Sequence, residues 1–457
     1  MSERSFDVIV MGAGPAGEVC AGRLAEGGLS VALVEPELVG GECSFWACMP
    51  SKALLRPAEL LSEVRRVPGA AQAVTGQLDV EATFARRDEV IHELDDSGQL
   101  PWLESRGIEL VREWGRIEGE RRVRAGDQVL VAERAVVVAT GTVAVIPPID
   151  GLREAQPWTS REITTAKQVP RRLAILGGGV VGVEMAQAWR TLGARVTLIE
   201  ATDRLIAREE EFAGQLVADS LSERGVELRL GSKATAVSRT DGEVTIELED
   251  GPAVVVDELA VAIGRSPHTD DLGLESVGLD PGESIEVDDR MRATGVEGNW
   301  LYAVGDVNGR ALLTHVGKYQ SRVAATVILG GEARATHDGP TSPRVIFTDP
   351  QVAAVGHTMR SAREAGLSVR SVDRDTSGNA GASFIGRDAP GITRLVIDED
   401  RKVLAGATFT GFEVADFLHA ATIAVVGQVP LDRLWHAIPS FPTRSEVWLD
   451  LLEEHES

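Results

Sequence analysis

Residues 7–35 read DVIVMGAGPAGEVCAGRLAEGGLSVALVE, and this stretch decides the fold. An apolar run leads into Gly12, Gly14 and Gly17, and a helical stretch, a second apolar run and Glu35 follow. This order predicts a strand, a helix and a second, parallel strand. Gly12 permits the tight turn, Gly14 lets backbone amides approach a pyrophosphate, and Gly17 lets the helix pack closely on the strand. Glu35, at the end of the second strand, is expected to accept hydrogen bonds from ribose hydroxyls.

The same pattern returns in residues 173–200, LAILGGGVVGVEMAQAWRTLGARVTLIE. Its glycines are Gly177, Gly179 and Gly182, and Glu200 follows the first glycine at the same distance as Glu35 does in the first stretch. The sequence therefore predicts two dinucleotide-binding units in one chain.

The second unit is predicted to prefer NADH over NADPH. A carboxylate at Glu200 favours a free 2′-hydroxyl and repels a 2′-phosphate. Arg204 and Arg208 follow closely and would soften this preference if either side chain reached the ribose.

Two of the three cysteines, Cys43 and Cys48, lie in residues 40–52, GGECSFWACMPSK. Five positions on an ideal helix rise by roughly 7.5 Å, beyond the roughly 7 Å limit on the Cα separation of a disulfide. A bridge would thus need a distorted helix, which the preceding glycines and Pro50 permit. A helix N-terminus here would also lower the pKa of the thiols. The alternative is two buried, reduced cysteines, and Cys20 is expected to be a core residue of the first helix.

Composition limits the class of protein. The chain has 457 residues, 43% apolar and 25% charged, with a formal net charge of −24. This is globular composition for about three domains. The negative charge disfavours nucleic acid and anionic lipid as partners, and three cysteines exclude a disulfide framework. Without a signal-peptide core or an apolar run of roughly 18 residues, the chain is expected to be cytoplasmic and not bound to a membrane.

These motifs together resemble the pyridine nucleotide-disulfide oxidoreductases, the flavoproteins that include dihydrolipoamide dehydrogenase, glutathione reductase and mercuric reductase. Further segments are similar to the family's in the expected order: residues 138–141 (VATG), 262–265 (AIGR), 301–306 (LYAVGD) and 345–350 (VIFTDP). The resemblance implies FAD on the first fingerprint and a nicotinamide coenzyme on the second. It adds cofactor contacts at Gly41, Thr140, Gly141, Gly264, Gly305 and Asp306.

The resemblance also implies a relay in which reducing equivalents pass from the nicotinamide through FAD to a Cys43–Cys48 disulfide. By position, Cys48 would be the thiol next to the flavin and Cys43 the interchange thiol that meets the substrate. Lys52 corresponds to the lysine near the flavin, and Glu184 to the acid that pairs with it. The alternative is that Lys52 and Glu184 are solvated helix charges.

One segment departs from the family pattern. Members similar to dihydrolipoamide dehydrogenase have a His-Pro-Thr segment followed by Glu, and this histidine is the acid/base of the dithiol. Here residues 441–446 read FPTRSE, so Phe441 stands at the position of the base and Glu446 has lost its expected partner. A positioned acid/base is worth about 10² to 10⁴ in rate, and His436 is a weak substitute because Pro439 intervenes.

The sequence thus predicts a FAD-dependent oxidoreductase that oxidises NADH and reduces a small-molecule acceptor such as a disulfide or a quinone. Three alternatives stay open: dihydrolipoamide dehydrogenase with a relocated base, soluble pyridine nucleotide transhydrogenase, and a non-catalytic flavin-binding redox sensor. The absence of cysteines after Cys48 argues against mercuric reductase, and no metal site is expected.

The predicted fold class is α/β, with two Rossmann-like dinucleotide-binding domains and a C-terminal α+β dimerisation domain. Residues 1–148 and 267–332 are predicted to form the FAD-binding domain, 149–266 the NAD(P)-binding domain, and 343–457 the dimerisation domain. The resemblance implies a homodimer.

Overall fold

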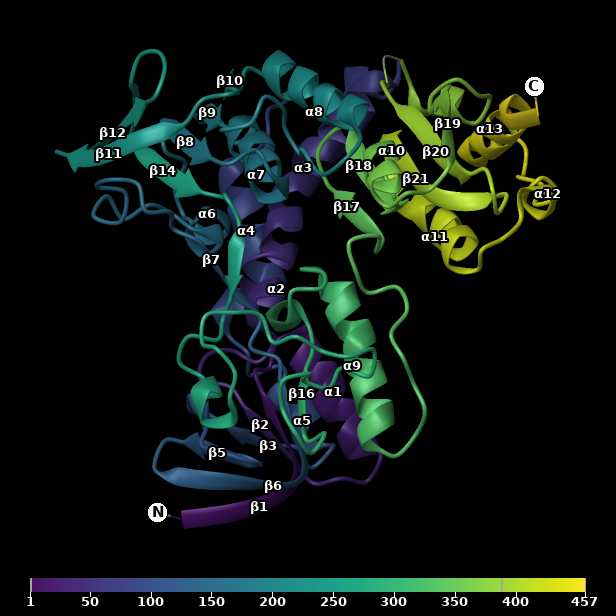
Figure 1. Cartoon of the computed structure of the whole chain (residues 1–457). Helices are drawn as coiled ribbons and strands as arrows, with labels where there is room; N and C mark the ends of the chain where they lie inside the picture. Colours follow the sequence, from purple (N-terminus) through teal and green to yellow (C-terminus); the bar gives the residue numbers. More distant parts are fainter. Residues whose placement is uncertain (1, 388, 457) are drawn as a thin grey trace. The chain divides into compact units, whose positions relative to one another are not determined.

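The computed structural model describes residues 2–387 and 389–456 (Figure 1). Two compact units are present, each assembled from separate stretches of the chain. The first unit holds residues up to 50, 87–145 and 265–340, and the second holds 51–86, 146–264 and the chain from 341 onward.

A seven-stranded sheet forms the centre of the first unit. Its strands, in spatial order, are β3 (Glu109–Val111), β2 (Val31–Val34), β1 (Ser2–Met11), β6 (Gln128–Val138), β5 (Arg122–Ala125) and β4 (Gly115–Ile117), with β16 (Leu301–Ala303) also paired to β6. The strands from β3 to β6, and β16, run parallel, whereas β4, β5 and β6 pair antiparallel. The Arg- and Glu-rich pattern of residues 112–133 predicts a small antiparallel excursion, and the pairing of β4, β5 and β6 confirms it.

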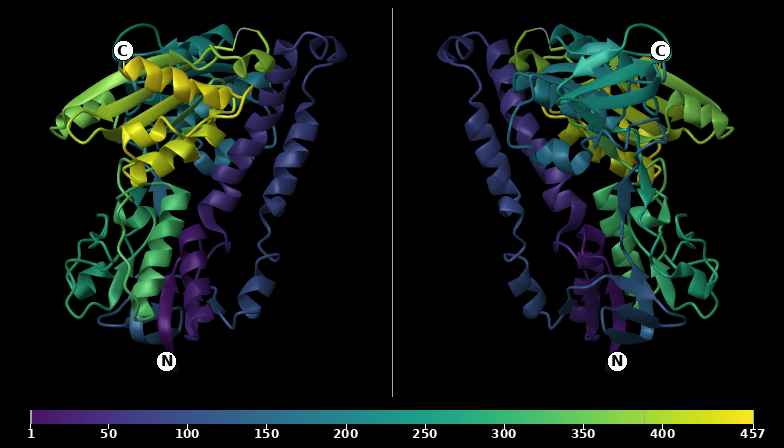
Figure 2. Two further views of the ribbon diagram at one scale, coloured as in Figure 1. Left: turned by 90° about the vertical axis from the view of Figure 1, so that its right-hand side faces the viewer. Right: turned by 90° about the vertical axis from the view of Figure 1, so that its left-hand side faces the viewer.

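Two helices of the first unit lie side by side in both views, α1 (Pro15–Glu26) and α9 (Thr314–Ile328) (Figures 1 and 2). Cys20 of α1 is fully buried in the core between the sheet and these helices, as expected. A small two-stranded sheet, β7 (Thr142–Ala144) with β15 (Arg265–Pro267), completes the unit.

The charged pattern of residues 81–104 predicts one helical stretch, but the helix is interrupted. Helix α4 (Val80–Val90) ends early, and α5 (Leu100–Glu104) is a separate short helix. Between them His92, Glu93 and Leu94 have φ of 50°, 53° and 63°. This left-handed backbone cannot continue a right-handed helix, so the expectation of one helical stretch was wrong.

The second unit contains the other fingerprint. A four-stranded parallel sheet has the order β10 (Glu227–Arg229), β9 (Arg195–Ile199), β8 (Arg172–Leu176) and β14 (Glu258–Val261). An antiparallel sheet follows, with β11 (Ala234–Thr240), β12 (Glu243–Leu248) and β13 (Val254–Val256). The helices are α6 (Ser160–Thr165), α7 (Val180–Thr191), α8 (Glu211–Glu223) and most of α3 (Cys48–Arg66). Trp189 of α7, fully buried, anchors this core.

The C-terminal part of the second unit is an antiparallel sheet covered by helices (Figure 2). Its strand order is β17 (Arg344–Ile346), β18 (Gln351–Gly356), β21 (Val403–Gly411), β20 (Ile392–Asp398) and β19 (Val369–Asp375). The helices are α10 (Met359–Glu364), α11 (Leu418–Val426), α12 (Leu431–Leu434) and α13 (Val447–Glu456). The predicted fold class, two Rossmann-like domains with a C-terminal α+β domain, is confirmed.

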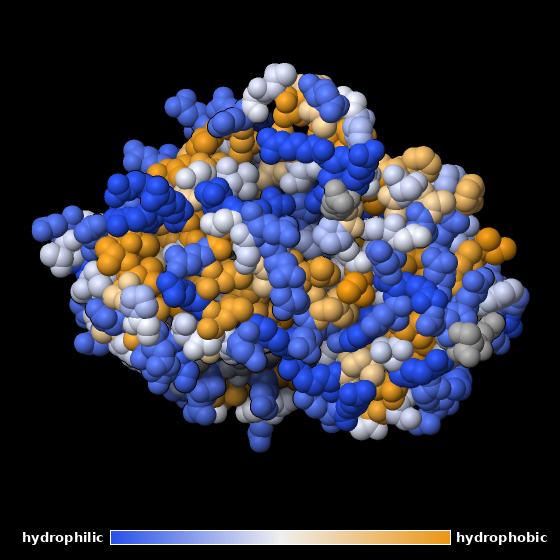
Figure 3. Space-filling view, turned by 90° about the horizontal axis from the view of Figure 1, so that it is seen from above, coloured by the Kyte–Doolittle hydropathy of each residue, from blue (hydrophilic) through white to orange (hydrophobic). Residues whose placement is uncertain are grey.

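The face seen in Figure 3 is mainly hydrophilic, with apolar side chains scattered among polar ones. Within the described ranges, 2–387 and 389–456, no helix is both long and apolar enough to cross a membrane.

Candidate active site

The first fingerprint has the strained geometry that its glycines predict. Gly12 has φ +100°, and a Cβ there would lie 2.4 Å from the carbonyl oxygen of Ala139. A Cβ at Gly17 would lie 1.9 Å from the carbonyl oxygen of Gly12. A Cβ at Gly14, the N-cap of α1, would meet nothing within 4 Å. Gly12 and Gly17 therefore serve close packing, and Gly14 leaves the helix N-terminus open to a ligand.

Glu35 follows β2 and is buried. Its Oε2 accepts a hydrogen bond from the amide of Ala13 at 2.8 Å, and its Oε1 accepts one from the amide of Glu37 at 2.9 Å. Burial raises the pKa of this carboxyl, and the two amide bonds oppose the rise. Glu35 thus braces the fingerprint turn.

The 301–306 motif supplies a second acid to the same unit. Asp306 accepts a hydrogen bond from Thr142 Oγ1 at 3.1 Å, and Arg265 Nε donates to that hydroxyl at 2.7 Å. Burial raises the pKa of Asp306, while Thr142 and Arg265 favour its ionised form. Gly305 has φ +80° and donates its amide to Gln320 Oε1 at 2.8 Å.

The 138–141 motif leads into the same region. Thr140 Oγ1 donates to the carbonyl of His268 at 2.9 Å, and Gly141 has φ +71°. The Thr142–Arg265 contact was not foreseen, because no local pattern links residues so far apart in sequence.

The two cysteines of the 40–52 segment lie on different helices. Cys43 lies on α2 (Gly41–Phe45), which ends at Trp46 with φ −133°, and α3 begins at Cys48. The predicted distortion is therefore present, and both cysteines are in the reduced thiol form. Cys48 Sγ lies 3.4 Å from Thr314 Oγ1 at the start of α9. The sequence gave no sign of Thr314, which comes from a distant helix.

The expected lowering of thiol pKa is wrong for Cys43. A hydrogen bond with Cys48, followed by burial, raises the pKa of the Cys43 thiol, whereas Thr314 and Lys318 act in the opposite direction. A helix N-terminus stabilises a thiolate, but α2 has only five residues and this stabilisation is weak. The hydrogen bond with the Cys48 thiol and burial outweigh it. Burial also raises the pKa of Cys20, to about 12, so this third thiol is inert.

Lys52 and Glu184 form an ion pair within the second unit. Lys52 Nζ lies 2.8 Å from Glu184 Oε2, and the Glu184 side chain is only 3% exposed. Glu184 Oε1 accepts a hydrogen bond from the amide of Phe347 at 2.9 Å, and Lys52 Nζ lies 4.8 Å from the centroid of the Phe347 ring. Glu184 is therefore not a solvated helix charge.

The second fingerprint repeats the geometry of the first. Gly177 has φ +108°, and a Cβ there would lie 2.5 Å from the carbonyl oxygen of Ala262. A Cβ at Gly182 would lie 1.8 Å from the carbonyl oxygen of Gly177, and one at Gly179 would meet nothing within 4 Å. Glu200 Oε2 accepts from the amide of Gly178 at 2.5 Å. Gly264, with φ +148°, is also open.

The ribose end of this fingerprint contains two arginines. Arg204 donates to the carbonyl oxygens of Ala207 and Glu209, the latter at 3.3 Å, so its guanidinium is engaged by backbone. Arg208 is exposed.

At the C-terminal end, Phe441 is 76% exposed, and His436 is exposed and meets Trp435 edge-on at 5.4 Å. Among the residues that the structure describes, Glu446 Oε2 is buried and has no hydrogen-bond partner. Trp448 packs against the core of the C-terminal sheet, with its ring centroid 5.8 Å from that of Phe409.

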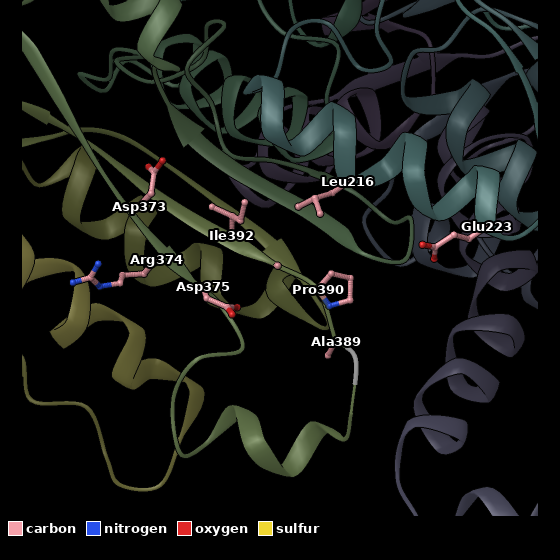
Figure 4. Close-up of a pocket in the computed structure, with 9 residues that line it drawn as sticks. Leu216, Glu223, Asp373, Arg374, Asp375, Ala389, Pro390 and Ile392 are labelled. Carbon is pink, nitrogen blue, oxygen red and sulfur yellow. The ribbon is translucent and has the colours of Figure 1, made fainter.

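A surface pocket of the second unit lies between α8 and strands β19 and β20 (Figure 4). Glu223, Asp373 and Asp375 make it acidic. Its lining contains no residue of the second fingerprint, and its charge disfavours a phosphate ligand. In the described part of the chain, no group of His, Cys, Asp and Glu side chains is arranged to hold a metal ion.

The residues present fit a dinucleotide at each fingerprint. Gly14 and Gly179 cap α1 and α7 without a side chain over the first amides, which is the arrangement that accepts a pyrophosphate. Asp306, desolvated and held by Thr142, is an acceptor for a hydroxyl chain beside the first fingerprint. The exposed apolar side chains of Val180 and Val181 offer contact area beside the second.

Comparison with known proteins agrees with this geometry. Residues 6–326 match the family model described as pyridine nucleotide-disulphide oxidoreductase, and residues 342–452 match that family's dimerisation domain. Dihydrolipoyl dehydrogenase of Thermus scotoductus is 32% identical over 98% of this chain and 97% of that protein. Mercuric reductase of Shigella flexneri is 31% identical over 95% of this chain and 78% of that protein.

A solved structure, the Cu(II) complex of the HOCl-induced flavoprotein disulfide reductase RclA from Escherichia coli, superimposes with a TM-score of 0.86 at 25% identity, covering 99% of each chain. LpdA from Mycobacterium tuberculosis shares the fold, with a TM-score of 0.85 at 24% identity. The chain belongs to the pyridine nucleotide-disulfide oxidoreductase family, whose members are FAD-dependent oxidoreductases that use NAD(P)H.

Proposed function

We propose that this protein is a homodimeric oxidoreductase that takes electrons from NADH and passes them to an acceptor other than lipoamide. Phe441 carries this proposal, because it stands where the family's dithiol base is expected. The buried, unpartnered Oε2 of Glu446 agrees with a lost histidine partner.

Bound FAD supplies the two-electron chemistry that links a nicotinamide to a disulfide or another acceptor. On the first unit, we assign the pyrophosphate to the amides around Gly14 and the sugar and ribityl hydroxyls to Glu35 and Asp306. Gly12, Gly17, Gly41, Thr140, Gly141 and Gly305 are proposed to shape this site.

The second unit would bind NADH through the amides around Gly179, with Gly177, Gly182 and Gly264 shaping its backbone. Glu200 would accept hydrogen bonds from the free ribose hydroxyls. Arg204 is held by backbone carbonyls, whereas the exposed Arg208 is the arginine that would soften the preference if it reached the ribose. The Glu200 carboxylate supports a preference for NADH over NADPH.

The thiols and the ion pair complete the proposed machinery. Cys43 would meet the acceptor and Cys48 would lie next to the cofactor, while Lys52, held in place by Glu184, would supply positive charge there. Glu446 would help to position the C-terminal segment. The proposed domains are 1–148 with 267–332 for FAD, 149–266 for NAD and 343–457 for dimerisation.

Substitution at the base position tests the proposal. Phe441→His should raise the rate of NAD reduction by dihydrolipoamide at least tenfold, since a positioned base is worth about 10² to 10⁴. Ile438→His, at an exposed apolar residue of the same segment, is the matched control and should change nothing. A wild-type rate of NAD reduction by dihydrolipoamide that exceeds the rates of NADH oxidation by quinones and disulfides would contradict the proposal.

The second candidate is dihydrolipoamide dehydrogenase with a relocated base, favoured by the 32% identical relative of that name. An acceptor screen with disulfides, quinones and nicotinamide analogues separates the two. Repeating the screen with Cys43→Ser identifies the acceptors that are reduced through the disulfide, because only their reduction should be lost in this variant.

A further inference from the structure

A buried glutamine of the first unit, Gln320 on α9, belongs neither to the fingerprints nor to the proposed chemistry. Its side chain is completely buried. Its Oε1 accepts hydrogen bonds from the amide of Gly305 at 2.8 Å and from Asn308 Nδ2 at 2.9 Å. Its Nε2 donates to Asp338 Oδ2 at 3.0 Å. A buried polar side chain with all its hydrogen bonds made specifies one arrangement of its neighbours.

These neighbours fix the orientation of the Gln320 amide. The amide of Gly305 can only donate, and Asn308 also donates, since its Oδ1 accepts from the amide of Arg310 at 3.1 Å. On the other side the Asp338 carboxylate accepts, and it is held by Arg310 Nη1 at 2.8 Å. Position 320 therefore needs one acceptor and one donor on the same side chain, and a glutamine supplies both.

The network ends at the turn that carries Asp306. Gly305 has φ +80° and ψ −159°, a backbone conformation that glycine adopts far more readily than other residues. Because Asp306 follows directly, fixing the amide of Gly305 also fixes the direction in which the chain enters Asp306. The Asp306 carboxylate in turn accepts from Thr142 Oγ1 at 3.1 Å. Without an acceptor at position 320, the buried amide of Gly305 would have to turn towards another partner.

The same face of α9 also holds the first fingerprint. A Cβ at Gly317 would lie 3.1 Å from Gly305 Cα and 3.3 Å from Ala16 Cβ. Ser321 Oγ donates to the carbonyl of Ala16 at 2.7 Å. Gly317, Gln320 and Ser321 share one face of α9, because they are three and four positions apart. This face therefore sets the spacing between the start of α1 and the turn at Gly305.

We propose that Gln320 and Asp338 position the flavin-binding turn, because they hold the amide of Gly305 so that Asp306 presents its carboxylate to the ribityl hydroxyls of FAD. Both are positioning residues, and the inference rests on the proposed role of Asp306 towards FAD. Asp338, paired with Arg310, is the fixed end of the network, and Gln320 transmits its position to the turn.

The test starts from the FAD-loaded, full-length protein. Equilibrium dialysis gives the Kd for FAD, and competition with FAD gives the Kd for ADP. ADP carries the pyrophosphate and the ribose of the fingerprint site but has no ribityl chain, so it cannot use the Asp306 carboxylate. Neither measurement requires NADH or an acceptor, so the readout does not depend on activity.

Gln320→Met keeps the length of the side chain and removes its hydrogen-bonding groups. The turn should then relax, and FAD binding would have to restore it. We expect the Kd for FAD to rise about tenfold to a hundredfold, the cost of one buried group without a partner. The Kd for ADP should stay within twofold of wild type.

Exchanging donor and acceptor between the two positions tests the network directly. Gln320→Glu keeps an acceptor for Gly305 but places a second carboxylate against Asp338, so FAD affinity should fall about as far as in Gln320→Met. Combining Gln320→Glu with Asp338→Asn restores a donor opposite the introduced carboxylate and should return the Kd for FAD to within threefold of wild type. This pair of variants decides the question even if Gln320→Met fails to fold.

The effect must also pass through Asp306. In an Asp306→Ala background, Gln320→Met should weaken FAD binding by less than twofold further. Gln187→Met is the matched control, since Gln187 of the second unit is also buried and its Oε1 accepts from the amide of Asp349 at 2.8 Å. It should leave the Kd values for FAD and ADP unchanged.

A Kd for FAD within twofold of wild type in both Gln320→Met and Gln320→Glu would overturn the proposal. Equal losses of FAD and ADP affinity would overturn it too, because a general loss of structure produces them, and so would a failure of Asp338→Asn to rescue Gln320→Glu. If the affinities change as expected but NADH does not reduce the bound flavin, the proposed function fails and this inference stands.

Discussion

The two fingerprints have nearly the same backbone and different surroundings. In both, the third glycine packs against the carbonyl oxygen of the first glycine. A Cβ would lie 1.9 Å from that oxygen at Gly17 and 1.8 Å from it at Gly182. The start of α1 is covered on one side by α9, since Ser321 Oγ donates to the carbonyl of Ala16 at 2.7 Å, while its N-terminus stays open at Gly14. The start of α7 is open, because Val180 and Val181 are 44% and 38% exposed. A covered site suits a cofactor that stays bound, and an open site suits a coenzyme that exchanges.

Replacing the third glycine of either fingerprint with alanine should disrupt that site and leave the other intact. Gly17→Ala places a methyl within 2 Å of a backbone carbonyl, which no side-chain motion can relieve, so we expect the flavin content to fall at least tenfold. Gly182→Ala creates the same clash in the second unit and should keep the flavin while the rate of its reduction by NADH falls to a similar extent. Absorbance of the purified variants and stopped-flow reduction measure the two effects.

Gly76→Ala is the control for both, since a Cβ there meets nothing within 4 Å. If Gly182→Ala lost flavin as fully as Gly17→Ala does, the two sites would not be separate.

The acids at the strand ends, Glu35 and Glu200, are expected to have different effects on cofactor binding. Glu200→Ala should raise the ratio of kcat/KM for NADPH to that for NADH by about 10-fold to 100-fold, because repulsion of a 2′-phosphate is removed. Glu35→Ala should leave this ratio unchanged and weaken FAD retention instead. An unchanged coenzyme ratio in Glu200→Ala would assign the preference to other residues.

Helix α1 also carries an acid, Glu18, whose pKa is raised by burial. The native state holds a proton on Glu18 up to about pH 7, whereas an unfolded glutamate releases it near pH 4.3. The native state thus binds more protons in this interval, so the free energy of unfolding should fall as the pH rises from about 4.5 to 7. Glu18→Gln should remove about 1 to 3 kcal/mol of this decline. Urea unfolding at pH 5 and pH 8 measures it, and a decline as large in the variant as in wild type would contradict the assignment.

The smallest effect is expected at the ion pair of the second unit. Glu184→Gln keeps an acceptor for the amide of Phe347 but removes the charge that holds Lys52. Because Lys52 is 36% exposed, solvent screens the pair, and we expect a loss of about 1 kcal/mol in the free energy of unfolding. A larger drop in the rate of flavin reduction than in stability would support a role of Lys52 in the reaction.

Local patterns predicted both fingerprints, because strand, glycine turn, helix and acid lie within 30 residues and each has its own physical reason. The break at His92–Leu94 was missed because hydrophobic and charge periodicity does not report φ. Strand-like runs at residues 344–347, 393–397 and 403–410 predict three strands of the C-terminal sheet, whereas β18 and β19 were missed. Thr314 was missed as well, because it reaches Cys48 only through the position of α9 in the fold. Contacts of this kind depend on tertiary structure and have no local signature.

An anaerobic NADH titration of the purified protein, followed by filtration, tests whether the first site keeps its flavin while the second exchanges its nicotinamide. We expect a yellow protein with about one FAD per chain, whose colour is bleached by NADH, and a filtrate that contains the oxidised nicotinamide while the flavin stays with the protein. A colourless protein that takes up no FAD on reconstitution, or one that releases its flavin and retains the nicotinamide, would contradict it.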